Sequence, residues 1–412
     1  MNTTQQPNDQ SAEPARIAIV GGGPGGLIAA LALARRGIRS AVFERDAHPE
    51  LMPRFNPDRS YTIDITGHGL RALRSVDATS YFDARMLPFK GIQYHGRVVQ
   101  DWPEPGWTGS RGDIVRSAMA PITAHHLSDI DFAFETQVSD VDVQAGTLTY
   151  ASNGQDLTTR EFDLIIGADG AGSVVRQAMQ HQILGFTVET SSIPNYVTML
   201  ALDRADATMD RRYLHALSIR NFYVAGAVPG DDGIDSERWF CAIGTNHELK
   251  LSSPEAARTF LQETCPAILD LASEESVVEF ADRTCYHVGR SLTCSQLHGG
   301  KAVLLGDAAS PFPPIGQGVN AAMESATVLA DHLADADGDL TEAAARYDKA
   351  WRPEAQAVAW ISQRFLFGNP ANTLRSVVSG IFGLNLAELA KSSATPYSEV
   401  RKQAERFGPL CK

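Results

Sequence analysis

Five glycines within six residues lie near the start of the chain and constrain its fold more than any other feature. They occupy positions 21 to 26, interrupted only by Pro24, in the stretch RIAIVGGGPGGLIAALALARRGIRSAVFERD that begins at Arg16. Glycine within a helix or strand costs roughly 0.5–1 kcal/mol relative to alanine. A run this dense therefore indicates a segment in which bare backbone is required.

The glycines stand between an apolar run and an alanine-rich run. Residues 17–20 are typical of a buried parallel strand, and residues 27–36 are strong helix formers. The spacing G-x-G-x-x-G is formed by Gly21, Gly23 and Gly26. In such a strand–turn–helix unit the first glycine makes the tight turn, the second admits a pyrophosphate and the third lets the helix pack on the strand. The pattern predicts dinucleotide binding at the helix N-terminus.

An acidic residue follows the next predicted strand. Residues 41–43 are apolar and end at Glu44, with Arg45 beside it. A carboxylate at this position accepts hydrogen bonds from ribose hydroxyls and repels a 2′-phosphate, which favours FAD or NAD over NADP. An ordinary glycine-rich turn is the alternative, and the combination of strand, helix and acid argues against it.

Two further stretches share this layout. FDLIIGADGAGSVVRQAM starts at Phe162, and KAVLLGDAASPFPPIGQGVNAAMESATVLADHL starts at Lys301. Each places a carboxylate, Asp169 or Asp307, and bare backbone at the carboxyl end of an apolar strand, where open α/β sheets bind ligands. One nucleotide does not need three such loops, whereas a long flavin cofactor lying across the sheet does.

These landmarks, in this order, resemble the FAD-dependent aromatic hydroxylases. This is the single-component family that includes p-hydroxybenzoate hydroxylase and kynurenine 3-monooxygenase. The GxGxxG motif with Glu44, the DG motif at residues 167–170 and the GD motif at Gly306 and Asp307 carry the resemblance, from residue 16 to about 345. It implies an α/β protein with a Rossmann-like FAD-binding domain, an antiparallel-sheet substrate domain and C-terminal helices.

The resemblance also implies roles for individual residues. Asp307 would hydrogen-bond the ribityl chain, and the helix that begins at Gly318 would direct its N–H groups at the pyrimidine end of the flavin. Arg111 and Arg59 would contact the cofactor, with a surface salt bridge as the alternative, and Asp169 would contact it or form a turn. The complete set of predicted cofactor-binding residues is Gly21, Gly23, Gly26, Glu44, Arg45, Arg59, Arg111, Asp169, Gly170, Asp307, Gly316, Gly318, Val319 and Asn320.

The chemistry that the resemblance implies is that of a class A flavoprotein monooxygenase. NAD(P)H reduces FAD, oxygen forms a C4a-hydroperoxide, and its distal oxygen passes to an electron-rich carbon, so that an aromatic or polycyclic molecule is hydroxylated or epoxidised. Apolar walls that exclude water would protect the hydroperoxide from decay to hydrogen peroxide. Pro313 and Pro314, in SPFPPIGQG, are expected near the substrate with a loop carbonyl facing it, and a plain rigid turn is the alternative. No second GxGxxG motif occurs, so NADH or NADPH is expected to bind transiently.

The substrate itself is less well specified. Tyr94 and His95, in GIQYHGR, lie near the place where kynurenine hydroxylases carry an arginine for the substrate carboxylate, but Ile92 falls at that place here. Kynurenine is therefore not expected, and an apolar aromatic or polycyclic substrate fits better. Tyr94 and His95 are candidate pocket residues, although surface or core packing is the favoured alternative. Neither a catalytic base nor a metal site is evident.

The cofactor landmarks are far apart in the sequence, so the FAD-binding domain is expected to be discontinuous. We assign a disordered tail at 1–14, FAD-binding segments at 15–79, 105–184 and 298–345, substrate-domain segments at 80–104 and 185–297, and a helical C-terminal region at 346–412. The segment LRSVVSGIFGLNLAELA, from Leu374, could lie on a membrane as an amphipathic helix, but packing against the body is favoured.

Composition narrows the partners and the location. A net charge of −13 argues against nucleic acid and anionic membranes as partners. The five cysteines form no CxxC pair and the N-terminus has no apolar signal region, which together predict a cytoplasmic protein. A monomer or homodimer is expected. A flavin-dependent reductase of isoprenoid double bonds and a non-catalytic FAD-binding module remain alternatives. A halogenase is disfavoured because no WxW sequence occurs.

Overall fold

The computed structural model describes residues 16–55, 62–153, 155–205, 209–218, 221–336, 338–365, 389, 391 and 393–406. The predicted tail at 1–14, Arg59 and most of the segment from Leu374 lie outside these residues.

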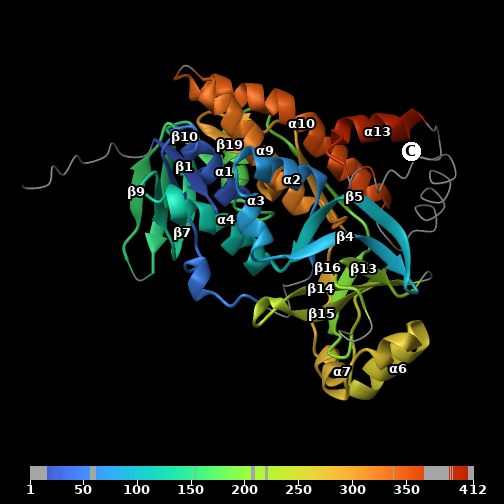
Figure 1. Cartoon of the computed structure of the whole chain (residues 1–412). Helices are drawn as coiled ribbons and strands as arrows, with labels where there is room; N and C mark the ends of the chain where they lie inside the picture. Colours follow the sequence, from blue (N-terminus) through green and yellow to red (C-terminus); the bar gives the residue numbers. More distant parts are fainter. Residues whose placement is uncertain are drawn as a thin grey trace, which may run out of the picture.

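A six-stranded sheet contains the three strands predicted to precede the cofactor loops (Figure 1). Its order is β18-β19-β10-β1-β2-β6, and every pairing except that of β18 with β19 is parallel. The strands are β1 (Ile17–Val20), β2 (Ser40–Phe43), β6 (Ile130–Ala133), β10 (Leu164–Gly167), β18 (His298–Gly299) and β19 (Ala302–Leu304). β1, β2 and β10 are buried along their whole length, as their uninterrupted apolar sequences predicted. The Rossmann-like part of the fold is confirmed.

Helices pack around this sheet. They are α1 (Pro24–Ala34), α4 (Arg111–His125), α5 (Val174–Gln182), α8 (Gly306–Ala309), α9 (Gly318–Ala334) and α10 (Leu340–Phe365). α1 carries no polar side chain and is buried from Gly25 to Ala34, because it contacts both α4 and α9 as well as the sheet. α10 in turn packs on α9 and on α13 (Tyr397–Arg406).

An eight-stranded, mostly antiparallel sheet forms the second part of the molecule (Figure 1). Its strands, in spatial order, are β16 (Tyr286–His287), β12 (Tyr196–Ala201), β15 (Gly233–Thr245), β14 (Phe222–Gly230), β13 (Tyr213–Ala216), β4 (Leu87–Tyr94), β5 (Arg97–Gly109) and β3 (Ile63–Ile65). α6 (Pro254–Thr264) and α7 (Glu274–Ala281) cover the face that carries Leu200, Tyr223 and Cys241. The predicted antiparallel substrate sheet is therefore present.

The eight-stranded sheet begins earlier in the sequence than we expected. β3 and the last residues of β5 belong to it, although we placed 15–79 and 105–184 in the FAD-binding part. Ile63 pairs with Gly109 and Ile65 with Trp107. A strand of three residues shows no recognisable periodicity, so only its partner across the sheet identifies it.

Smaller sheets and short helices complete the fold. A three-stranded sheet consists of β7 (Thr136–Asp142), β8 (Thr147–Ser152) and β9 (Thr158–Glu161), and β11 (Val188–Ser192) pairs with β17 (Arg290–Cys294). Among the described residues, the remaining helices are η1 (Pro49–Leu51), α2 (Gly67–Ser75), α3 (Thr79–Asp83) and η2 (Pro266–Asp270). Within the described residues, no helix combines the length and the apolar character needed to cross a bilayer.

Candidate cofactor and substrate site

The three glycines of the GxGxxG motif differ in what their surroundings require. A Cβ on Gly21, whose φ is 104°, would lie 2.5 Å from the Ala168 carbonyl oxygen, and one on Gly26 would lie 2.0 Å from the Gly21 oxygen. These two glycines are needed for the fold itself. Gly23 has an ordinary φ of −72°, and its Cβ would meet only the Arg111 guanidinium, at 3.7 Å. Its bare backbone leaves space that the protein does not fill, which fits the predicted approach of a pyrophosphate.

Glu44 ties the end of β2 to this loop. Its Oε2 accepts a hydrogen bond from the Gly22 N–H at 2.5 Å, and its Oε1 accepts one from the Asp46 N–H at 2.9 Å. The neighbouring Arg45 is exposed. The carboxylate thus lies beside the glycine loop, where the predicted ribose contact needs it.

Asp307 and Arg111 are the two charged groups that best match a bound ligand. Both side chains are accessible to solvent, and among the described residues neither has a hydrogen-bond or ion-pair partner. Desolvation by the surrounding protein nevertheless raises the pKa of Asp307, while the charges of Arg111 and Arg176 lower it. An accessible but desolvated carboxylate is typical of a recess, and a polar ligand there would supply the missing hydrogen bonds.

Arg176 is a site residue that the sequence analysis did not identify. It is 6% exposed and donates from its two terminal nitrogens to the Ala308 oxygen, at 2.8 Å, and to the Ala171 oxygen. It therefore joins the DG loop to the GD loop. Burial lowers the pKa of its guanidinium. A signal was present, because Arg176 is the only charged residue after Asp169 in the stretch FDLIIGADGAGSVVRQAM.

Asp169 caps a helix and also has one free oxygen. Its Oδ2 accepts from the Val174 N–H at 2.6 Å, at the start of α5, which is the turn role given as the alternative. Its Oδ1 is buried and has no partner among the described residues, and burial raises the pKa of the carboxyl. Gly170 follows with a φ of 77°, a conformation that favours glycine. The contact of Asp169 with the cofactor stays a prediction.

The proline-rich loop is held from both sides. The Pro311 oxygen accepts from the Leu292 N–H at 2.9 Å, and the Pro313 oxygen accepts from the Ser362 hydroxyl at 2.8 Å. Pro313 is buried, whereas Pro314 is exposed. Since the Pro311 and Pro313 carbonyls already accept hydrogen bonds from the protein, the Phe312 and Pro314 carbonyls are the better candidates for the predicted substrate contact.

The start of α9 supports the predicted flavin contact through its backbone. Gly318, Val319 and Asn320 form its first turn, whose N–H groups have no partner within the helix. The Asn320 side chain has a different task. Its Nδ2 donates to the Asp64 and Gly316 oxygens at 2.8 and 2.9 Å, and its Oδ1 accepts from Thr66 N–H. The Asn320 side chain is therefore engaged within the protein, and the residue is fully buried.

Tyr94 and His95 lie at the tip of the β4–β5 hairpin. Tyr94 pairs with Arg97, and His95 and Gly96 form the two-residue turn, with φ values of 46° and 72°. His95 is exposed. The structure thus favours the surface alternative for both residues over a role in the pocket.

An apolar face of the large sheet lies on the side opposite α6 and α7. It consists of Met199, Val228 and Phe240, with Val197, Ala201 and Ala242 at its margin. Phe55 stacks on Phe240 at 4.7 Å, and the preceding Arg54 bonds Asp113 in the first turn of α4. This face therefore approaches the helix that begins at Arg111.

Comparison with known proteins agrees with this geometry. Residues 15–362 match the family model described as "FAD binding domain". Kynurenine 3-monooxygenase of Salinispora arenicola is 28% identical over 363 residues, which cover 84% of this chain and 78% of that protein. The Saccharomyces cerevisiae protein of the same name is 25% identical over 387 residues, covering 84% and 80%.

Solved structures share the fold. The tetrameric form of 2-methyl-3-hydroxypyridine-5-carboxylic acid oxygenase superimposes with a TM-score of 0.67 at 20% identity, covering 92% of this chain and 96% of that one. PqsL of P. aeruginosa in complex with 2-aminobenzoylacetate gives 0.64 at 20% identity, covering 85% and 95%. With the three motifs at the ends of β1, β10 and β19, these matches show that the chain belongs to the FAD-binding family of flavoprotein monooxygenases, the FAD-dependent aromatic hydroxylases.

Proposed function

We propose that the protein uses NAD(P)H and O2 to hydroxylate or epoxidise an apolar aromatic or polycyclic small molecule. FAD supplies the redox chemistry when bound, and the protein supplies position and shelter. The observation that carries the proposal is a recess beside Asp307, which Gly306, Phe312 and Gly318 line. Asp307 and Arg111 are exposed and have no hydrogen-bond or ion-pair partner among the described residues, and Arg111 lies beside the open backbone of Gly23.

The sheet face formed by Met199, Val228 and Phe240 supports an apolar substrate. Ile92, at the place where kynurenine hydroxylases carry an arginine, packs against Phe89, Trp102 and Leu214. An apolar residue in an apolar cluster offers no counterion to a carboxylate. The substrate that this arrangement favours is therefore an aromatic molecule without an amino-acid group.

The residues around the recess have distinct tasks in this proposal. The three loops bind and orient the cofactor, the anchored proline loop limits access of water, and the apolar face positions the substrate ring. NAD(P)H binds transiently. We further propose a cytoplasmic location, which the four free cysteines among the described residues support, and a monomer or homodimer.

The test measures NAD(P)H oxidation by the FAD-loaded protein with phenols, indoles and polyenes under labelled oxygen, followed by mass spectrometry of the products. The proposal requires one labelled oxygen atom per product molecule and faster NAD(P)H oxidation with the true substrate. Reduction of a double bond without oxygen would instead indicate the isoprenoid reductase. A bound flavin that NAD(P)H never reduces would indicate a non-catalytic module.

A further inference from the structure

A lysine from the C-terminal part of the chain lies against the loop that precedes α9. A Cβ built on Gly316 would lie 3.3 Å from both Cε and Nζ of Lys391. Gly316 is two residues before Gly318, the first residue of α9. Lys391 thus brings a positive charge to the helix end that already carries the positive pole of the helix dipole.

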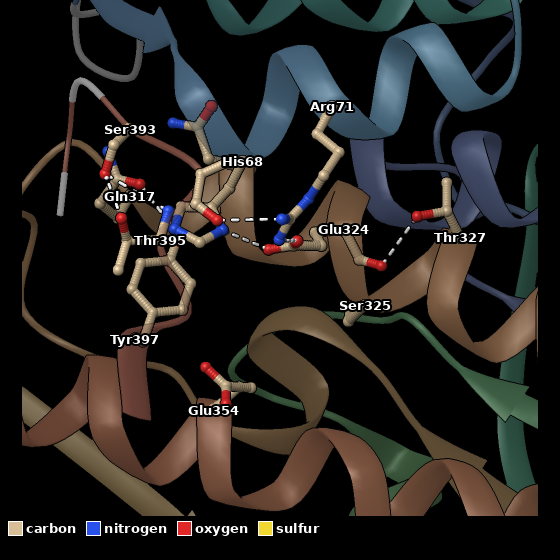
Figure 2. A network of polar contacts seen from close by, with 12 residues as sticks. His68, Arg71, Gln317, Glu324, Ser325, Thr327, Glu354, Ser393, Thr395 and Tyr397 are labelled. Atoms are coloured by element: carbon tan, nitrogen blue, oxygen red, sulfur yellow. Dashed lines mark hydrogen bonds and ion pairs between the residues drawn. The ribbon is translucent and has the colours of Figure 1, made fainter. Parts of the chain in front are cut away.

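The chain next to Lys391 is fixed in place by close backbone contact. A Cβ on Gly67 would lie only 2.1 Å from the Ser393 oxygen, so only glycine lets the C-terminal segment cross the first turn of α2. Arg71 donates to the Ala394 oxygen at 2.9 Å, and the Ser393 hydroxyl bonds Thr395 at 3.0 Å (Figure 2). The segment that follows Lys391 is therefore seated on α2.

A buried polar network holds the same segment against α9 (Figure 2). The Tyr397 ring stacks on His68 at 3.9 Å, and its hydroxyl donates to Gln317 Oε1 at 2.9 Å. His68 Nδ1 lies 2.5 Å from Glu324 Oε2, and Arg71 pairs with the other oxygen of Glu324. Gln317 stands between Gly316 and Gly318, so this network fixes the residue next to the Lys391 contact.

A carboxylate from β3 lies against the same loop. Asp64 of β3 is 5% exposed, and its Oδ2 lies 3.8 Å from the Cβ position built on Gly316. Its Oδ1 has no hydrogen-bond partner among the described residues. Burial raises the pKa of Asp64 to about 6, although the Lys391 charge opposes the shift. Burial likewise lowers the pKa of Lys391, and Asp64 opposes that shift.

Lys391 and Asp64 interact electrostatically without forming a direct ion pair. No ion pair within 4.0 Å joins them among the described residues, and the two groups approach the loop at Gly316 from separate positions. Each charge therefore contributes its own electrostatic potential at the start of α9, with opposite sign. Charges in a partly desolvated site act more strongly than charges in water.

We propose that Lys391 and Asp64 tune the electron affinity of the bound flavin in opposite directions. The first turn of α9 is the predicted contact of the flavin pyrimidine end, where negative charge accumulates when the ring is reduced. Lys391 stabilises that charge and favours the reduced form, and Asp64, when ionised, disfavours it. The inference concerns FAD, which family membership assigns, and does not depend on the substrate proposed above.

The experiment compares FAD-loaded variants without substrate and without oxygen. The ratio of reduced to oxidised flavin is measured in equilibrium with a reference dye, and the dissociation constant of the flavin–sulfite adduct is measured in parallel. Lys391→Met should lower the ratio about tenfold and weaken sulfite binding, whereas Asp64→Asn should raise the ratio about tenfold and strengthen it. Lys391→Arg retains the charge and should behave like the wild type.

Lys402→Met is the matched control, because Lys402 is exposed on α13 and its removal changes the net charge equally. Shifts of the same sign in Lys391→Met and Asp64→Asn, or no shift in either, would overturn the proposal. A structural role would lower FAD content in both variants. If Lys391→Met does not retain FAD, Lys391→Gln with sulfite titration replaces it, and an unchanged sulfite constant there would also refute the proposal. None of these readouts requires monooxygenase activity.

Discussion

Gly23→Ala tests the predicted pyrophosphate position most directly, because the protein itself has no need of a glycine there. The backbone at Gly23 has a φ of −72°, which alanine adopts freely, and the new methyl group would contact only the Arg111 guanidinium at 3.7 Å. The apoprotein should fold with an unchanged free energy of unfolding, within about 0.5 kcal/mol.

The effect on the cofactor should be large. A methyl group that projects into a filled site costs about 1–3 kcal/mol in enforced displacement. The dissociation constant of FAD should therefore rise about 5- to 150-fold, since each 1.4 kcal/mol is about tenfold. Gly26→Ala should behave differently, because its Cβ would lie 2.0 Å from the Gly21 oxygen and would force α1 away from β1.

The assay has two measurements on the same variants. Urea denaturation of the apoprotein gives the free energy of unfolding, and titration with FAD, followed by quenching of flavin fluorescence, gives the dissociation constant. Gly172→Ala is the control, because a Cβ there meets nothing within 4 Å and the residue is not among the predicted contacts. Gly26→Ala should lose about 3 kcal/mol or more of folding stability.

One result would refute the reasoning about Gly23. If Gly23→Ala binds FAD as tightly as the wild type and Gly172→Ala do, the pyrophosphate does not lie at this loop position. Lost stability in the Gly23→Ala apoprotein would show instead that the position is needed for the fold.

Three further predictions follow from the site. Asp307→Asn should raise the FAD dissociation constant about 10- to 100-fold with an unchanged apoprotein melting temperature, as a hydrogen bond to a charged group contributes about 1.5–3 kcal/mol; a variant that is purified fully yellow would contradict this. Because burial raises the Asp64 pKa from 3.8 to about 6, its contribution to stability is complete below pH 3.8 and is lost as the pH rises through 6. Between pH 4 and pH 7, urea unfolding should therefore show that the free energy of unfolding of Asp64→Asn rises by about 2 kcal/mol relative to that of the wild type, and parallel pH profiles would exclude the shift. Tyr397→Phe should cost about 1 kcal/mol of unfolding free energy, because Gln317 Oε1 loses its donor, whereas Tyr286→Phe at an exposed position should cost nothing measurable.

The amino-acid sequence alone determined the strands, the cofactor loops and the family. Glycine spacing, uninterrupted apolar runs and a carboxylate at each strand end are local patterns, so β1, α1, β10, β19 and α9 could be predicted within a few residues. Such patterns depend on neighbours along the chain, and for that reason the dinucleotide-binding loop at Gly21–Gly26 can be recognised without a structure.

Only the tertiary structure determined the contacts between residues far apart in the sequence. Asn320 holds the backbone of Asp64, Arg176 joins two loops, and Lys391 reaches Gly316. No periodicity records such pairs, because each depends on how separate segments pack. The environment of a side chain, which decides its charge and its partners, is a property of that packing, and this is why the roles of Asp64 and Lys391 became visible only in three dimensions.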